Sequence, residues 1–210
     1  MLLVGHRANT QRWLRRHLAC TGMVEVDVVD ESGTLRGGHV GPAGAPLLLR
    51  ERIGRAIEGL RFTPSPPLRA LLSWLPPGAR VMLDLKDPVE PGRLLGEVRS
   101  AGLDPGEVYV STRWHNLSPR LSSTGFRVLL SIDCRPHDPA GLVSAAAAAG
   151  VAVRYSYLDP GFVEELHRGG YVVAAWTVNT PAALRRVAGL GVDLVVTDAP
   201  CRLRRWLRGG

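Results

Sequence analysis

Residues 24–29 read Val-Glu-Val-Asp-Val-Val, a run in which apolar β-branched residues alternate with two carboxylates. Successive side chains of a strand point to opposite faces, so Glu25 and Asp27 share one face and the intervening valines share the other. The valines predict a buried strand that packs this face against helices. Two carboxylates on the other face of a buried strand predict a polar site there, because unpaired charges are costly to bury.

Comparable short runs recur along the chain and alternate with helical patterns. We predict eight strands, at Leu2–Gly5, Val24–Val29, Arg80–Lys86, Glu107–Ser111, Phe126–Ile132, Val151–Tyr155, Tyr171–Val178 and Val192–Thr197. Apolar-periodic or alanine-rich segments between them predict helices at Thr10–Ala19, Pro91–Ala101, Pro139–Ala149, Pro160–Arg168 and Pro181–Ala188. Eight such units favour a (β/α)8 TIM barrel, which we expect to form one compact domain over residues 1–210.

Local signals agree with this order of elements. Asp138, Asp159 and Thr180 each precede a proline, which is typical of a helix start. The largest interruption runs from Gly37 to Pro77, and its glycines and prolines predict an irregular loop rather than a second domain. An open doubly wound sheet is the alternative architecture, but no G-x-G-x-x-G motif follows the first strand.

Composition limits the class of protein. Hydrophobic residues make up 45% of the 210 residues and charged residues 21%, as in globular proteins rather than disordered chains. No apolar run reaches the roughly 18 residues of a membrane span, and we expect a cytoplasmic protein. Cys20, Cys134 and Cys201 are widely spaced and lack a C-x-x-C pair, so we expect buried, reduced thiols and no zinc site.

The net charge of +7 predicts anionic partners, which include phosphorylated small molecules, anionic lipid surfaces and nucleic acid. Aromatic residues are only 6% and no nucleic-acid-binding motif is present, which argues against nucleic acid. The basic segment Arg202–Arg208 has an amphipathic pattern and allows weak contact with an anionic membrane surface. Lys86 is the only lysine among 26 basic residues. The sequence leaves the oligomeric state open.

Polar residues gather at the predicted strand ends, where barrels of this kind place their active sites. His6 and Arg7 follow the first strand, Asp84 and Lys86 share one face at the end of the third, and Trp176 lies near the end of the seventh. Crowded carboxylates at a barrel mouth repel one another unless a hard divalent cation binds them. The guanidinium of Arg7 and the ammonium of Lys86 suit phosphate oxygens.

Taken in order, these motifs resemble those of the glycerophosphodiester phosphodiesterase family, a phosphatidylinositol-phosphodiesterase-like TIM barrel. The matching pieces are Gly5-His6-Arg7, Glu25-Val26-Asp27, His39, Asp84-Leu85-Lys86, Ala175-Trp176-Thr177-Val178-Asn179 and Gly191-Val192-Asp193 with Thr197-Asp198-Ala199-Pro200. The resemblance implies metal-dependent hydrolysis of glycerophosphodiesters to glycerol 3-phosphate and an alcohol. The resemblance also implies a role for each site residue. Glu25, Asp27 and Asp84 would bind Mg²⁺ or Ca²⁺, and His6 and His39 would be the general acid/base pair. Arg7 and Lys86 would hold the phosphate, and Trp176 would form a wall of the substrate pocket.

The sequence departs from the family pattern at three places. Asp84 stands where the family has glutamate, which predicts a metal closer to this strand or a bridging water. Val40 follows His39 where the family has aspartate, so the partner that orients His39 is not identified. The loop after His6-Arg7 keeps only Ala8-Asn9-Thr10, which predicts a more open rim.

These departures keep two alternative functions open. One is lysophospholipase D-like activity on lipid diesters, and the other is a non-catalytic barrel that binds an anionic ligand. Among the remaining polar residues, we interpret Asp198 as a helix cap before Pro200. The histidines outside the strand ends are interpreted as surface or structural residues: His17, His115, His137 and His167.

Overall fold

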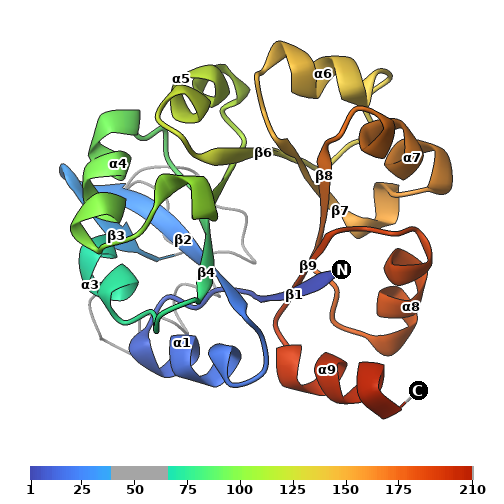
Figure 1. The fold of residues 1–210 in the computed structure, drawn as a ribbon, viewed down its shortest axis with the longest axis horizontal. Coiled ribbons are helices and arrows are strands. Elements are labelled where there is room, and N and C mark those ends of the chain that lie inside the picture. The colour runs from blue at the N-terminus through green and yellow to red at the C-terminus, as the bar shows by residue number, and fades with distance from the viewer. Residues whose placement is uncertain (39–65, 210) are drawn as a thin grey trace, which may run out of the picture.

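The computed structural model describes residues 1–38 and 66–209 and shows a ring of strands surrounded by helices (Figure 1). The parallel strands are β1 (Leu2–Gly5), β2 (Met23–Glu31), β4 (Arg80–Leu85), β5 (Val108–Thr112), β6 (Arg127–Ile132), β7 (Gly150–Arg154), β8 (Val172–Trp176) and β9 (Leu194–Thr197). They pair in the order β1-β9-β8-β7-β6-β5-β4-β2, and β1 also pairs with β2. This last pairing closes the sheet, which confirms the predicted barrel and excludes the open sheet.

A further strand, β3 (Thr34–Gly37), was not predicted. It pairs antiparallel with β2, with Glu31 opposite Thr34, through a tight turn at Ser32 and Gly33. Both turn residues have positive φ, 51° and 83°, which is the two-residue hairpin geometry that matches strand twist. Only four residues long, β3 is too short for its side-chain alternation to be recognised in the sequence.

Helices cover the outside of the barrel (Figure 1). Those described are α1 (Gln11–Leu18), α3 (Leu68–Ser73), α4 (Pro91–Ser100), α5 (Ser118–Ser123), α6 (Pro139–Ala145), α7 (Pro160–Arg168), α8 (Pro181–Gly189) and α9 (Pro200–Gly209), with 3-10 turns η1 (Pro105–Glu107), η2 (His115–Leu117) and η3 (Tyr155–Tyr157). The side chains of Asp138, Asp159 and Thr180 accept backbone hydrogen bonds at the starts of α6, α7 and α8, as predicted.

Helix α3 corrects the prediction of an irregular loop over the whole segment between Gly37 and Pro77. Its Leu68, Leu71 and Leu72 are buried. The i, i+3, i+4 spacing of these leucines places them on one side of a helix. The prolines immediately before this helix hid its short apolar period.

Helix α6 ends four residues earlier than predicted, although alanine favours helices. Ala147 takes φ 48°, and the N–H of Ala148 donates to the carbonyl of Val143 while that of Ala147 donates to Ser144. Such hydrogen bonds end a helix and normally place glycine in the left-handed position. The reversal leads directly into β7 at Gly150, so the position of the next strand overrides the preference of alanine for a helix.

The core has two layers. Val24, Val26 and Val28 pack in the outer layer, between strands and helices, as the alternation predicted. The inner layer fills the barrel with Met23, Met82 and other apolar side chains. The carboxylates of β2 therefore lie on the inner face, above this apolar filling.

A disulfide joins Cys20, just after α1, to Cys201 in the first turn of α9, with their Cα atoms 5.0 Å apart. The prediction of reduced thiols is therefore wrong for these two residues, and Cys134 is a free but exposed cysteine rather than a buried one. The spacing of 181 residues gave no hint of this pairing. Barrel closure brings the two cysteines together, because β1 pairs with both β9 and β2.

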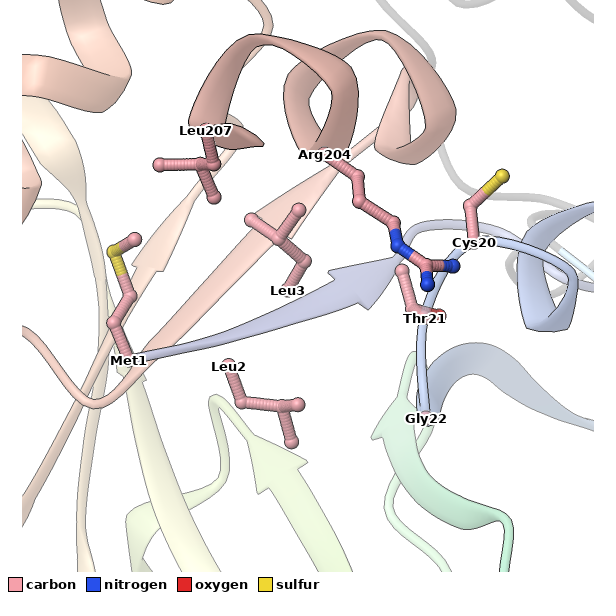
Figure 2. Close-up of a pocket in the computed structure, with 8 residues that line it drawn as sticks. All are labelled: Met1, Leu2, Leu3, Cys20, Thr21, Gly22, Arg204 and Leu207. Carbon is pink, nitrogen blue, oxygen red and sulfur yellow. The ribbon is translucent and has the colours of Figure 1, made fainter. Parts of the chain in front are cut away.

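A hollow of about 460 Å³ lies beside this disulfide, at the amino end of β1. Figure 2 shows Arg204 and Leu207 of α9 on one side of it, with Met1, Leu2 and Cys20 among the residues opposite. It lies at the end of the barrel away from the strand-end carboxylates, and Arg204 is the one charged side chain among its lining residues. In the part of the chain that the structure describes, no helix is long and apolar enough to cross a membrane.

Candidate active site

Three carboxylates meet at the carboxyl end of the barrel. Glu25 and Asp27 come from β2, and Asp84 of β4 lies directly opposite Asp27 in the strand register. One oxygen from each lies within 4.8 Å of the others. Glu25 and Asp27 are buried, with 3% and 0% of their side chains exposed, while Asp84 is partly open to solvent. The same-face prediction for Glu25 and Asp27 is confirmed.

Lys86 provides the counter-charge to this cluster. Its Nζ lies 2.8 Å from Asp27 Oδ1 and also donates to Asp84. Burial lowers the pKa of Lys86, but the attraction of Asp84, Asp27 and Glu25 outweighs it and holds the pKa above its ordinary value. Burial, with repulsion from Asp27 and Asp84, raises the pKa of Glu25 well above its usual range. One ammonium therefore does not neutralise three carboxylates.

The donor set fits a hard divalent cation. All three groups offer oxygen atoms, which Mg²⁺ and Ca²⁺ prefer over nitrogen or sulfur. Glu25 Oε1 is buried and has no hydrogen-bond partner among the described residues. A buried acceptor without a partner is costly, and a bound cation would satisfy it. Glu25, Asp27 and Asp84 are therefore a candidate metal site.

The imidazole of His6 lies between two carboxylates. Its Nδ1 is 2.6 Å from Asp198 Oδ1, and its Nε2 is 3.9 Å from Glu25 Oε2. Asn179 donates to the other oxygen of Asp198 at 2.6 Å. The hydrogen bond from His6 is the main cause that lowers the pKa of Asp198 to about 2. The interpretation of Asp198 as a helix cap is therefore wrong, because both of its oxygens are bonded to site residues.

The short loop after β1 holds the carboxylates in place. The backbone N–H of Arg7 donates to Glu25 Oε2 at 2.6 Å. Asn9 makes two bonds with Asp27, from its Nδ2 to Oδ2 at 2.7 Å and from the Asp27 N–H to its Oδ1 at 2.9 Å. Arg7 adopts φ 54°, a strained conformation of the kind found at functional sites. The role of Asn9 was missed, although its position directly after His-Arg-Ala was the available signal.

A cavity of about 150 Å³ opens beside these groups. Six of the predicted site residues line it: His6, Arg7, Glu25, Asp84, Lys86 and Trp176. Asp27 lies behind them and contacts Lys86, and the predicted acid/base residue His39 falls outside the described residues. The cavity is also lined by polar residues that the sequence analysis did not select: Ser111, Arg113, Ser131 and Thr177. The roles of all these residues stay predictions.

Residues 104–202 match the family model described as the glycerophosphoryl diester phosphodiesterase family. This match covers slightly less than half of the chain and shows that its carboxyl-terminal part is similar to that family. Glycerophosphoryl diester phosphodiesterases are hydrolases that act on phosphoric diesters, and the match assigns the chain to this class of enzyme. The matched region includes strands β5 to β9 together with Asn179 and Asp198.

Solved structures share the fold of this phosphodiesterase over nearly its whole length. A Silicibacter pomeroyi protein assigned as a glycerophosphoryl diester phosphodiesterase is 22% identical, with a TM-score of 0.81 over 99% of this chain and 93% of its own. A glycerophosphodiester phosphodiesterase from Agrobacterium tumefaciens is 22% identical, with a TM-score of 0.76 over 98% and 99%.

A phosphodiesterase from Oleispira antarctica, solved in complex with the product sn-glycerol-3-phosphate, is 18% identical, with a TM-score of 0.76 over 100% and 97%. No curated protein matches this phosphodiesterase sequence.

Proposed function

We propose that this phosphodiesterase hydrolyses glycerophosphodiesters to glycerol 3-phosphate and an alcohol, and that it requires a divalent metal. The observation that carries this proposal is the cluster of Glu25, Asp27 and Asp84 beside His6 in one cavity. The Oleispira antarctica structure supports the product, because that phosphodiesterase holds sn-glycerol-3-phosphate. Mg²⁺ and Ca²⁺ both suit the oxygen donors, and we propose one of them as the cofactor.

Each charged side chain has a separate task in this proposal. Glu25, Asp27 and Asp84 would hold the cation, which neutralises phosphate charge and makes a bound hydroxyl more acidic. Arg7 lines the cavity and presents a planar fork that matches two phosphate oxygens. Lys86, fixed by Asp27 and Asp84, presents a compact positive charge to the phosphate.

Proton transfer is assigned to histidine. A hydroxyl must lose a proton to attack phosphorus, and the leaving alkoxide must gain one. His6 donates from Nδ1 to Asp198, so its Nε2 remains on the side of Glu25 and the cavity to carry a proton. His39 is proposed as the second proton carrier on the family resemblance alone. Trp176 lines the same cavity and is proposed as a wall for the alcohol.

The proposal is tested by following glycerol 3-phosphate release from glycerophosphocholine and glycerophosphoglycerol, with added Mg²⁺ or Ca²⁺ and with chelator. We expect release with metal, loss with chelator, and loss in Glu25→Gln. The matched control is Glu164→Gln, because Glu164 is exposed on α7 away from the strand ends. If Glu25→Gln hydrolyses these diesters at the parent rate, the metal assignment is wrong.

A second candidate function is the hydrolysis of lipid diesters at an anionic surface. Helices α1 and α9 are joined by the disulfide, and the described residues of both carry arginines but no carboxylate. Exposed members of this basic surface are Arg12, Arg15, Arg16, Arg202, Arg205 and Arg208. Faster release of head group from a lysophospholipid in anionic vesicles than from glycerophosphocholine would favour this candidate.

The cytoplasmic location stays a prediction, and the disulfide is an observation against it, since disulfides are rare in that compartment.

A further inference from the structure

Two arginines lie at or beside the cavity, on strands that do not carry the carboxylates. Arg113 directly follows β5 and lines the cavity. Arg154 ends β7, and its guanidinium carbon lies 5.7 Å from the centroid of the Trp176 ring. Trp176 itself lines the cavity, so Arg113 borders this space and the guanidinium of Arg154 lies beside a ring that forms part of its wall. The carboxylates occupy β2 and β4, whereas these arginines come from β5 and β7.

The strand register supports this placement. Leu85 of β4 pairs with Thr112 of β5, so the next residues, Lys86 and Arg113, lie at the same level of the barrel. Arg154 pairs with Trp176 across β7 and β8. Two residues earlier on the same strands, Ser111 and Ala152 also line the cavity. Alternation therefore directs Arg113 and Arg154 to the inner side of the barrel.

Among the described residues, no carboxylate neutralises the positive charge of these two arginines. In the described portion of the chain, Arg113 and Arg154 form no ion pair with a carboxylate. Asp133 directly follows β6, the strand that lies between β5 and β7, but it is exposed and forms an ion pair with neither arginine. In the proposed function, the phosphate that reacts is already served by Arg7, Lys86 and the metal site, which come from β2, β4 and the loop after β1. Two further cations exceed what one phosphodiester needs.

We propose that Arg113, Arg154 and Trp176 form a second anion-binding subsite, which takes a phosphate or carboxylate carried by the leaving alcohol of the diester. This inference rests on the proposed function and assigns the substrate class: glycerophosphodiesters whose alcohol is anionic. The guanidinium groups offer paired N–H donors to anionic oxygens. A bare tryptophan wall favours a cationic alcohol such as choline through cation–π attraction, and the arginines reverse that preference by like-charge repulsion.

The test compares glycerophosphodiesters that differ in the charge of the alcohol. Each probe is a glycerophosphodiester that carries one of four alcohols. Glycerol 3-phosphate and lactate are anionic alcohols, glycerol is a neutral one and choline is a cationic one. Binding is measured by calorimetry at constant salt and divalent cation in a His6→Ala background, which removes the proposed proton carrier. The same four diesters are compared by kcat/KM in the parent protein. The variant is Arg113→Gln, and the matched control is Arg99→Gln, an exposed arginine on α4.

We expect at least one anionic diester to bind about tenfold or more tightly than the choline diester, as charge-assisted hydrogen bonds would give. Arg113→Gln removes this preference and leaves the neutral diester within about threefold, while Arg99→Gln keeps the preference. Equal binding of the anionic and choline diesters, or an equal loss for all diesters in Arg113→Gln, overturns the subsite. If the parent hydrolyses none of the diesters, the proposed function fails, and the order of binding still decides the subsite.

Discussion

The Nδ1 atom of His6 lies 2.6 Å from Oδ1 of Asp198, two residues that are 192 positions apart in the sequence. Asp198 follows β9 and His6 follows β1, and these two strands pair side by side. The carboxylate accepts the Nδ1 proton and so fixes the tautomer and the direction of the ring. Asp198 is therefore a positioning residue for the proposed proton carrier.

Asp198→Asn should lower kcat at least tenfold, because His6 then loses the acceptor that orients it, and a proton carrier contributes roughly 10²- to 10⁴-fold. KM should change little, since Asp198 does not line the cavity. Steady-state kinetics separates the two constants. Asp193→Asn is the control, as Asp193 forms another pair with a histidine, His167, at 3.0 Å outside the cavity. Equal kcat in the parent and Asp198→Asn would contradict the role.

Lys86→Arg should lower phosphodiester turnover at least tenfold, about 1.4 kcal/mol in the barrier. Nζ contacts both Asp27 and Asp84 in a crowded cluster, where a wide guanidinium does not reproduce the position of a compact ammonium. The thermal midpoint should stay nearly unchanged, because the positive charge remains. Activity and thermal unfolding are measured on the same preparation. Turnover within twofold of the parent would show that this position needs only a charge.

The free energy of unfolding should fall as the pH drops below 6.5, partly because of His17. Burial lowers the pKa of His17 from its ordinary value of 6.5, and its Nε2 bonds the carbonyl of His6 at 3.0 Å. Below pH 6.5 the unfolded chain binds a proton that the folded protein takes up only at lower pH, so folding loses stability. Denaturant unfolding measures this free energy at pH 7 and at pH 5, and the decrease between the two should be smaller in His17→Gln than in the parent. The same dependence of the free energy of unfolding on pH in both proteins would show that His17 does not contribute.

Ala147→Gly should stabilise the protein by about 0.5–1 kcal/mol, because alanine pays a steric cost at φ 48° that glycine avoids. The comparison is Ala145→Gly in the last turn of α6, where the backbone is helical and glycine should destabilise by a similar amount. Both residues are exposed, so packing changes little. Denaturant midpoints measure the two effects. Destabilisation by both substitutions would show that the left-handed turn at Ala147 carries no strain.

The sequence predicted the barrel because its signals were local and repeated. The alternation Val-Glu-Val-Asp-Val placed Glu25 and Asp27 on one face and the valines in the outer core, as observed. The Pro-capped helix starts were equally local. The predicted end of a helix was wrong where the next strand determines that end. The helix α6 was expected to continue through the alanine run, but the chain turns at Ala147 to enter β7.

The remaining site residues were hidden because their partners are far apart in sequence. Asp198 looked like a cap because Pro200 follows it, and only the pairing of β1 with β9 brings it to His6. Arg113 lies in a segment with no motif, and it becomes visible only when the register places it level with Lys86. The cysteines paired for the same reason, through closure of the barrel.

The disulfide between Cys20 and Cys201 makes residues 20–201 a covalent ring that contains every strand of the barrel except β1. A single backbone cut anywhere inside this ring leaves one molecule, which separates into two pieces only after reduction and unfolding. Strand β1 is held differently: it lies outside the ring and fits between β2 and β9 by parallel pairing. Among the described strands of the barrel wall, β1, which leads into His6 and Arg7, is thus the one that a backbone cut before Cys20 would leave attached by strand pairing and side-chain contacts alone.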